Sequence, residues 1–143
     1  MGDMIVREAR EAWFGENGFS EAGYQDRWVR LRAGPISLYF PNTKARRRAV
    51  KLHDLHHLAT GYQATWVGEV EIGAWELAAG CGRHYPAWIL NAMAVALGAV
   101  IAPRRTLRAF LRGRRSRTLY DGEYHEALLD LTLDQLRARL RLT

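Results

Sequence analysis

Apolar residues recur along most of this chain at the spacing of amphipathic helices. Near the N-terminus, Ile5, Ala9 and Trp13 return every four residues, so we predict a helix that Asp3 caps and Gly15 ends. A capping box at Thr132-Leu133-Asp134-Gln135 predicts the start of the last helix. The predicted helices after the first cover residues 43–60, 67–80, 87–102, 104–113 and 132–142.

The pattern changes between Trp28 and Phe40. Apolar and polar residues alternate there with a period of two on both sides of Gly34-Pro35, which indicates a short β-hairpin or extended arm. The rest of the chain has the helical period. We therefore expect an all-α protein, a single helical domain over residues 1–143, with this arm as its one β element.

The segment between Pro86 and Pro103 is apolar except for Asn91. Its 16 residues fall short of the roughly 20 that span a bilayer. We interpret it as a central buried helix; a helix that lies on a membrane or lines a lipid tunnel, and a true span, are the alternatives. Small residues every four positions allow close helix packing: Ala94, Gly98 and Ala102. The candidate lipid-facing residues are Trp88, Leu90, Val95 and Leu97.

Composition and charge indicate which class of protein this is and in which compartment we expect it. The hydrophobic fraction of 48% is that of a globular protein, and the net charge is +6. Cys81, the single cysteine, excludes an internal disulfide, and its two glycine neighbours suggest an exposed thiol. The N-terminus lacks the features of a signal peptide, so we expect a cytoplasmic protein.

Two clusters of basic residues account for the charge, at residues 44–51 and 104–117. A solvated basic face or an anionic membrane surface explains such clusters. Neither a zinc-finger spacing nor an aromatic RNA-binding motif accompanies them, so we expect no nucleic acid partner.

The residues with the most chemical content are His53, Asp54, His57 and Glu69. His53 and His57 are one turn apart on a predicted helix, and two imidazoles with two carboxylates suit a divalent ion such as Zn, Fe, Mn or Co. Glu76 and His56 are additional candidates. The alternative is a group of solvent-facing histidines with Asp54 paired to a nearby cation. A thermolysin-type protease is disfavoured because Asp54 replaces the glutamate that its motif requires.

The sequence His53-Asp54-Leu55-His56-His57, followed after eleven residues by Glu69 in Gly68-Glu69, resembles the signature of the coenzyme Q (ubiquinone) biosynthesis protein 4 family. The resemblance covers residues 42–140. It implies an all-helical homodimer, peripheral on the inner face of the membrane, with a prenylated quinone precursor or isoprenoid lipid as ligand and other quinone-biosynthesis enzymes as partners. It also implies that His53, Asp54, His57 and Glu69 are catalytic metal ligands.

Three functions stay open at this point. The resemblance implies a metal-dependent enzyme that removes a carboxyl group oxidatively from a prenylated aromatic head group. The second is a non-catalytic isoprenoid-binding scaffold with a structural metal. The third is a metal-dependent hydrolase of a phosphorylated isoprenoid, for which His84, His125 and Asp121 are further ligand candidates by type.

Overall fold

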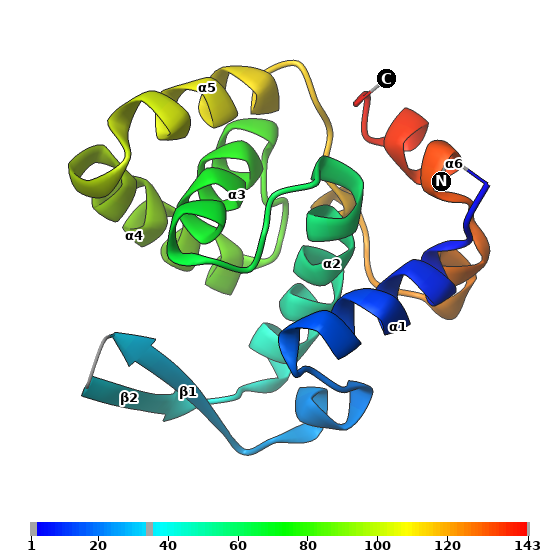
Figure 1. The fold of residues 1–143 in the computed structure, drawn as a ribbon, viewed down its shortest axis with the longest axis horizontal. Coiled ribbons are helices and arrows are strands. Elements are labelled where there is room, and N and C mark those ends of the chain that lie inside the picture. Colours follow the sequence, from blue (N-terminus) through cyan, green and yellow to red (C-terminus); the bar gives the residue numbers. More distant parts are fainter. Residues whose placement is uncertain (1–2, 34–35, 143) are drawn as a thin grey trace.

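The structure is a computed structural model that describes residues 3–33 and 36–142. Figure 1 shows a helical body with a small hairpin projecting from it. The α-helices are α1 (Val6–Asn17), α2 (Lys44–Thr60), α3 (Trp66–Ala79), α4 (Tyr85–Ile101), α5 (Pro103–Gly113) and α6 (Leu133–Arg139). Three short 3-10 helices complete it: η1 (Glu21–Gln25), η2 (Leu119–Asp121) and η3 (Glu126–Asp130). The predicted all-α class is confirmed.

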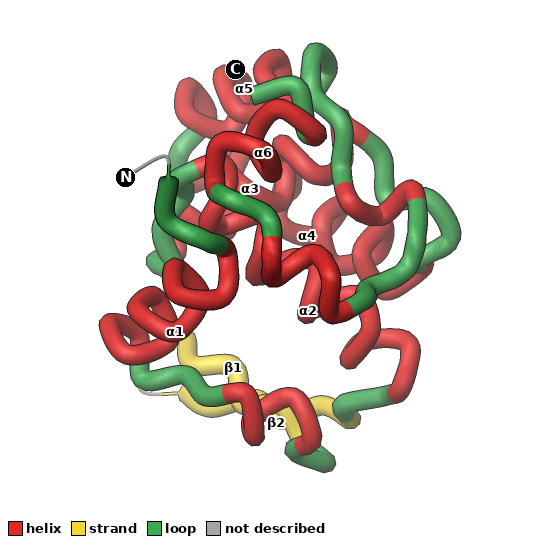
Figure 2. The backbone as a smooth tube through the Cα atoms, turned by 90° about the vertical axis from the view of Figure 1, so that its right-hand side faces the viewer, coloured by secondary structure: helices red, strands yellow, loops and turns green. Residues whose placement is uncertain are grey.

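Helix α2 lies between two groups of helices. α3, α4 and α5 pack together on one side of it, and α1 and α6 lie on the other (Figures 1 and 2). The core forms where these groups meet, around fully buried Leu52 and Leu55 of α2, Trp75 of α3, and Leu129 and Leu136 near the C-terminus. The middle of α2 is therefore enclosed, and any polar side chain there needs a partner.

The hairpin is present where the alternation predicts it. Strands β1 (Trp28–Ala33) and β2 (Ile36–Pro41) pair antiparallel, with Trp28 opposite Pro41. The predicted turn at Gly34-Pro35 lies outside the described residues. Both views show the strands extending away from the helical body rather than covering it (Figures 1 and 2).

The predicted ranges of α2 and α3 agree with the structure to within one residue, whereas both ends of α1 and the end of α6 differ by more. Thr43 and Thr65 cap α2 and α3 through their hydroxyl groups. The Asp3 cap is wrong: Ile5 forms a β-bridge with Thr132 that keeps the chain extended, so α1 starts at Val6. It continues through Gly15 to Asn17. The capping box at Thr132 is present, but α6 ends at Arg139 rather than near residue 142.

Helix α4 is not the central buried helix that its composition suggests. Only Pro86, Ala87, Asn91 and Gly98 are buried, and the rest of the helix is exposed or partly exposed. The small residues do serve close packing: a Cβ on Gly73 of α3 would come within 2.6 Å of the Ala94 Cβ. α4 therefore lies against α3 with one narrow stripe and leaves its apolar outer face open.

Of the four candidate lipid-facing residues, three are exposed. Trp88, Leu90 and Leu97 are on the outer face of α4. Val95 is the exception, because it follows buried Asn91 by four residues and precedes buried Gly98 by three, so it shares their inner stripe and packs against the core. The described helices include none long and apolar enough to span a bilayer.

Candidate metal centre

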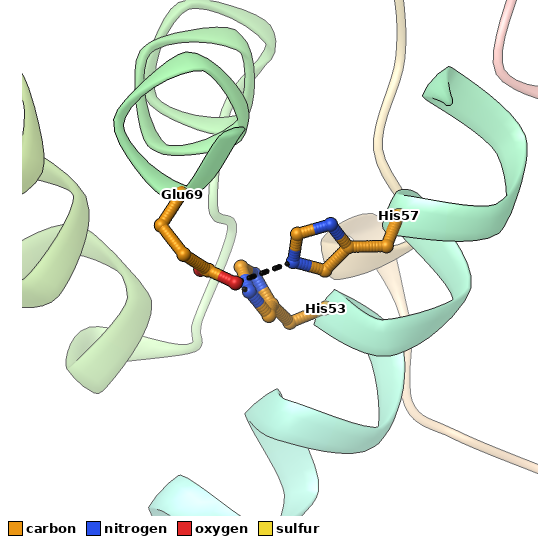
Figure 3. Close-up of side chains that lie close together, drawn as sticks. All are labelled: His53, His57 and Glu69. Carbon is orange, nitrogen blue, oxygen red and sulfur yellow. Dashed lines mark hydrogen bonds and ion pairs between the residues drawn. The ribbon is translucent and has the colours of Figure 1, made fainter. Parts of the chain in front are cut away.

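Three of the predicted ligands face one another between α2 and α3. His53 and His57 project from consecutive turns of α2, and Glu69 reaches them from the first turns of α3 (Figure 3). Their donor atoms all lie within 4.8 Å of one another. This group could hold a metal ion.

Each imidazole is held by its Nδ1 atom, which leaves Nε2 for the centre. His53 Nδ1 lies 2.9 Å from Glu76 Oε1, and His57 Nδ1 lies 2.7 Å from the Tyr62 carbonyl oxygen. A carbonyl only accepts, so the proton of His57 is on Nδ1 and donates to Tyr62. Metal-binding histidines typically donate their second ring N–H in this way to a carboxylate or a backbone carbonyl.

The Nε2 atoms meet the carboxylate of Glu69 at ligand spacing. His57 Nε2 is 3.0 Å from Glu69 Oε1, and His53 Nε2 is 3.3 Å from Glu69 Oε2. Around an ion with bonds of about 2.1 Å, adjacent ligand atoms stand roughly 3.0–3.4 Å apart, depending on whether the angle is octahedral or tetrahedral. These two separations therefore fit a shared cation.

His57 Nε2 gives independent support for this fit. It is buried, and within the described part of the chain no group forms a hydrogen bond with it, although Glu69 Oε1 is at ion-pair distance. With the proton on Nδ1, a lone pair on Nε2 faces a carboxylate, which is unfavourable unless a cation or proton lies between them. The ring is also stacked on Trp13 at 5.1 Å between centroids, which holds its direction.

Behind the donors, Glu76 of α3 contacts side chains of both α2 and η2. Its fully buried carboxylate contacts His53, His56 and the Tyr120 hydroxyl, which donates at 2.8 Å. His56 Nε2 accepts the backbone N–H of Leu119 at 2.9 Å, so its proton is on Nδ1 and donates to Glu76. Both additional candidates thus orient the site and are not donors in the three-residue group.

Within this cluster the carboxylates favour the charged form of His53, and the imidazoles favour the charged form of the carboxylates. Burial lowers the pKa of His53, but the carboxylates of Glu76 and Glu69 outweigh burial and raise it well above its usual value. Burial raises the pKa of Glu69, and the imidazoles of His53 and His57 overcome this and lower it to about 2. For His56 burial dominates, which lowers the pKa and keeps the ring neutral. Burial also raises the pKa of Glu76, and His53 and His56 overcome this and lower it, so both carboxylates facing His53 are ionised at neutral pH.

Asp54, the fourth predicted ligand, does not join the group. At about 100° per residue, its side chain points roughly 60° beyond His57 and away from Glu69. Its Oδ2 atom accepts the Tyr24 hydroxyl at 2.6 Å, beside η1. Burial raises the pKa of Asp54, against the charge of His53, which lowers it. The adjacent His-Asp pair therefore supplies one candidate ligand, His53, and one hydrogen bond, from Tyr24 to Asp54.

Two further expectations are not met. Cys81 is fully buried, and burial raises the pKa of its thiol to about 12, so the thiol is not the exposed group that its glycine neighbours suggest. The second concerns the extra ligands that a hydrolase would need. His84 Nε2 lies 2.8 Å from the Gly122 carbonyl oxygen, and the three-residue group includes none of His84, His125 and Asp121.

The sequence indicated Glu76 and His56 as additional groups at the site, but it did not indicate the other groups that support the donors. Tyr62 acts through its backbone, which carries no sequence signal, and Tyr120 comes from a segment far along the chain. Gly68 carries a usable signal: a Cβ there would lie 1.8 Å from the Gln63 oxygen. A glycine directly before Glu69 therefore lets the loop after α2 fold onto the start of α3.

No model of a known protein family matches this chain, and neither does any curated protein.

Proposed function

We propose that this chain is a metal-dependent protein of ubiquinone-type (prenylated quinone) biosynthesis that acts on an aromatic head group at a membrane surface. One observation carries the proposal: two Nε2 atoms and a carboxylate converge, while Glu76 and Tyr62 hold the opposite ring nitrogens. The resemblance of the His53–Glu69 segment to the coenzyme Q biosynthesis protein 4 family supplies the substrate class.

The exposure of the three donors suits a centre with open coordination positions. The His57 side chain is buried, whereas that of Glu69 is 44% exposed and that of His53 lies between them. A ligand from solvent would therefore approach along Glu69, with the two imidazoles behind it. Two histidines and one carboxylate are the set used for iron, and they also suit Zn, Mn and Co.

When bound, such an ion supplies polarisation of a phenolate or carboxylate oxygen, and a redox-active one supplies electrons for reaction with dioxygen. The residues of this chain have simpler tasks in the proposal. Glu69 and the two imidazoles hold the ion, Glu76 fixes the direction of His53, and Trp13 covers the buried side of His57. This division of tasks corresponds to the oxidative decarboxylation that the resemblance implies.

Turnover of a prenylated hydroxybenzoate tests the enzymatic proposal. Purified protein supplied in turn with Fe, Mn, Co and Zn is expected to release carbon dioxide with at least one of them. Glu69→Ala should reduce the rate by about 100-fold or more, because it removes a ligand and not merely a supporting group. Activity that persists in both Glu69→Ala and His57→Ala would refute the assignment.

The outer face of α4 supports the membrane part of the proposal. It carries large exposed apolar side chains along its whole length: Trp88, Ile89, Leu90, Met93, Leu97, Val100 and Ile101. Val100 is 81% exposed and Met93 is 64% exposed. Contiguous apolar surface of this kind marks an interaction site. Exposed arginines follow directly on α5, at Arg104, Arg105 and Arg108, and anionic lipid headgroups complement them.

Vesicle flotation provides the matching prediction. We expect the protein to float with vesicles that contain phosphatidylglycerol, and Met93→Glu with Val100→Glu to weaken this binding by roughly 100-fold, because two apolar side chains no longer insert. Phe19→Glu, at an exposed aromatic residue beyond α1, is the control and should bind normally. If the double variant binds normally while a native homodimer dissociates, the face is a subunit interface and not a membrane surface.

A non-catalytic scaffold is the second candidate, and the same apolar face favours it. In that case an isoprenoid lipid binds to α4 and the ion only stabilises the junction of α2 and α3. Glu69→Ala should then lower the melting temperature and leave lipid binding intact. Loss of function in a variant that melts normally would exclude the scaffold.

A further inference from the structure

A cavity with charged side chains in its wall lies on the other side of α2 from the candidate metal centre. It has a volume of about 470 Å³ and is lined by Gln25, Arg47, Arg48, Lys51, Glu123 and Tyr124. Arg47, Arg48 and Lys51 share one face of α2, and the middle of that face is about 160° from His53. This cavity therefore does not belong to the metal centre.

The three cations of the cavity form no ion pair with a carboxylate in the described part of the chain. Among the residues that the structure describes, none of Arg47, Arg48 and Lys51 has a carboxylate oxygen within 4.0 Å. The Arg47 Nε atom is buried and lacks a hydrogen-bond partner in the described chain. Glu123, at the rim, is largely exposed and partly offsets the positive charge.

Lys51 is held in place by two aromatic rings. Its ammonium nitrogen lies 5.6 Å from the centroid of the Tyr24 ring and 5.1 Å from that of Tyr124. Cation–π contacts at this distance restrict a side chain that otherwise moves freely in solvent. The cavity therefore has a preordered cation at its wall.

The position of these cations in α2 is electrostatically unfavourable without a ligand. The first turns of the helix carry Lys44, Arg46, Arg47 and Arg48, and its first turn has no acidic residue. The helix dipole places partial positive charge at the same end, where carboxylates are usually favoured. The dipole and the three cations together favour an anion with more than one charge.

We propose that this cavity binds a phosphate or diphosphate group, which Arg47 and Arg48 hold through their guanidinium N–H groups and Lys51 through its charge. Guanidinium groups bind phosphate oxygens in bidentate geometry, and the volume is within the range of small-ligand pockets. The group is either that of a free phosphorylated metabolite or that of a lipid headgroup. The inference does not depend on the metal centre or on the proposed enzymatic function.

Titration calorimetry of the full chain with inorganic phosphate and pyrophosphate tests the site. For a free ligand we expect saturable binding of pyrophosphate that Arg47→Gln with Arg48→Gln weakens by roughly ten-fold or more. Arg139→Gln with Arg141→Gln removes the same charge from exposed positions near the C-terminus and should leave binding unchanged. Equal losses in both double variants would mean attraction by net charge alone and would overturn the proposal.

Vesicles distinguish the lipid source. A headgroup site predicts stronger binding to vesicles of phosphatidic acid than to phosphatidylserine vesicles of equal surface charge, and predicts that Arg47→Gln with Arg48→Gln removes this difference. Binding of pyrophosphate in solution supports a free ligand, and a phosphatidic acid preference without it supports the headgroup. Failure of both measurements in protein with a normal melting curve would overturn the site.

Discussion

Replacing His57 by alanine is expected to remove stoichiometric metal from the purified protein. The substitution deletes one of three donors, and supporting residues alone typically change metal affinity by 10–100-fold, so we expect a loss beyond roughly 100-fold. Elemental analysis combined with native mass spectrometry measures both occupancy and stoichiometry. His125→Ala removes an exposed histidine outside the centre and should retain the ion of the wild type.

The carboxylate side of the centre has its own matched pair. Glu69→Gln should lower metal affinity as His57→Ala does, whereas Glu71→Gln, two residues further along α3, should not. Asp54→Asn tests whether the ion has three protein ligands or four. The geometry predicts that this variant keeps metal affinity within about ten-fold of the wild type, because Asp54 contacts Tyr24 and lies outside the three-residue group. If both Glu69→Gln and His57→Ala bind metal as the wild type does, the assignment of the metal centre to these residues is refuted.

The second large effect is expected on stability, at Glu76. In Glu76→Gln the amide retains one acceptor oxygen for the three donors on His53, His56 and Tyr120, and its NH2 group is forced against one of them. Losing one member of a buried charged network costs about 3–5 kcal/mol, so the melting temperature should fall by roughly 10 °C or more. Denaturant titration without metal measures the change.

The comparison for this prediction is Glu71→Gln, which alters the same residue type on the same helix outside the network. It should stay within about 0.5 kcal/mol of the wild type. The two substitutions also test the assignment of His56, since its neutral Nδ1–H form requires an acceptor at Glu76. If Glu76→Gln unfolds with the wild-type midpoint, the network does not stabilise the core as described.

Local signals predicted those parts of the fold that local interactions determine. The start of α2 and the period-two alternation near Trp28 depend on neighbours within a few residues, and both features are where the sequence predicts them to within one residue. The start of α1 depends instead on pairing between Ile5 and Thr132, which no local pattern reveals. A contact across the chain therefore explains why the start of α1 was misplaced.

The candidate site was also predicted where local geometry determines it, and only there. One helical turn between His53 and His57 is enough to bring both imidazoles to one face, and Glu69 was found from the motif. Asp54 follows His53 directly, so its side chain points about 100° away from that of His53, and in the structure it accepts a hydrogen bond from Tyr24 outside the three-residue group. Composition also misplaced α4, because hydrophobicity shows that a surface is apolar but not whether the protein itself covers it.

Arg112 connects the surface of α5 to the metal centre. Its NH1 group donates to the Thr60 carbonyl at 3.1 Å, and its guanidinium lies 5.2 Å from the centroid of the Tyr62 ring. The carbonyl of that same tyrosine holds His57. A displacement of α5 would therefore reach the support of His57 through Arg112 and Tyr62. If the proposed lipid surface and the proposed ion site both act through this contact, linkage requires that each changes the affinity of the other by the same factor.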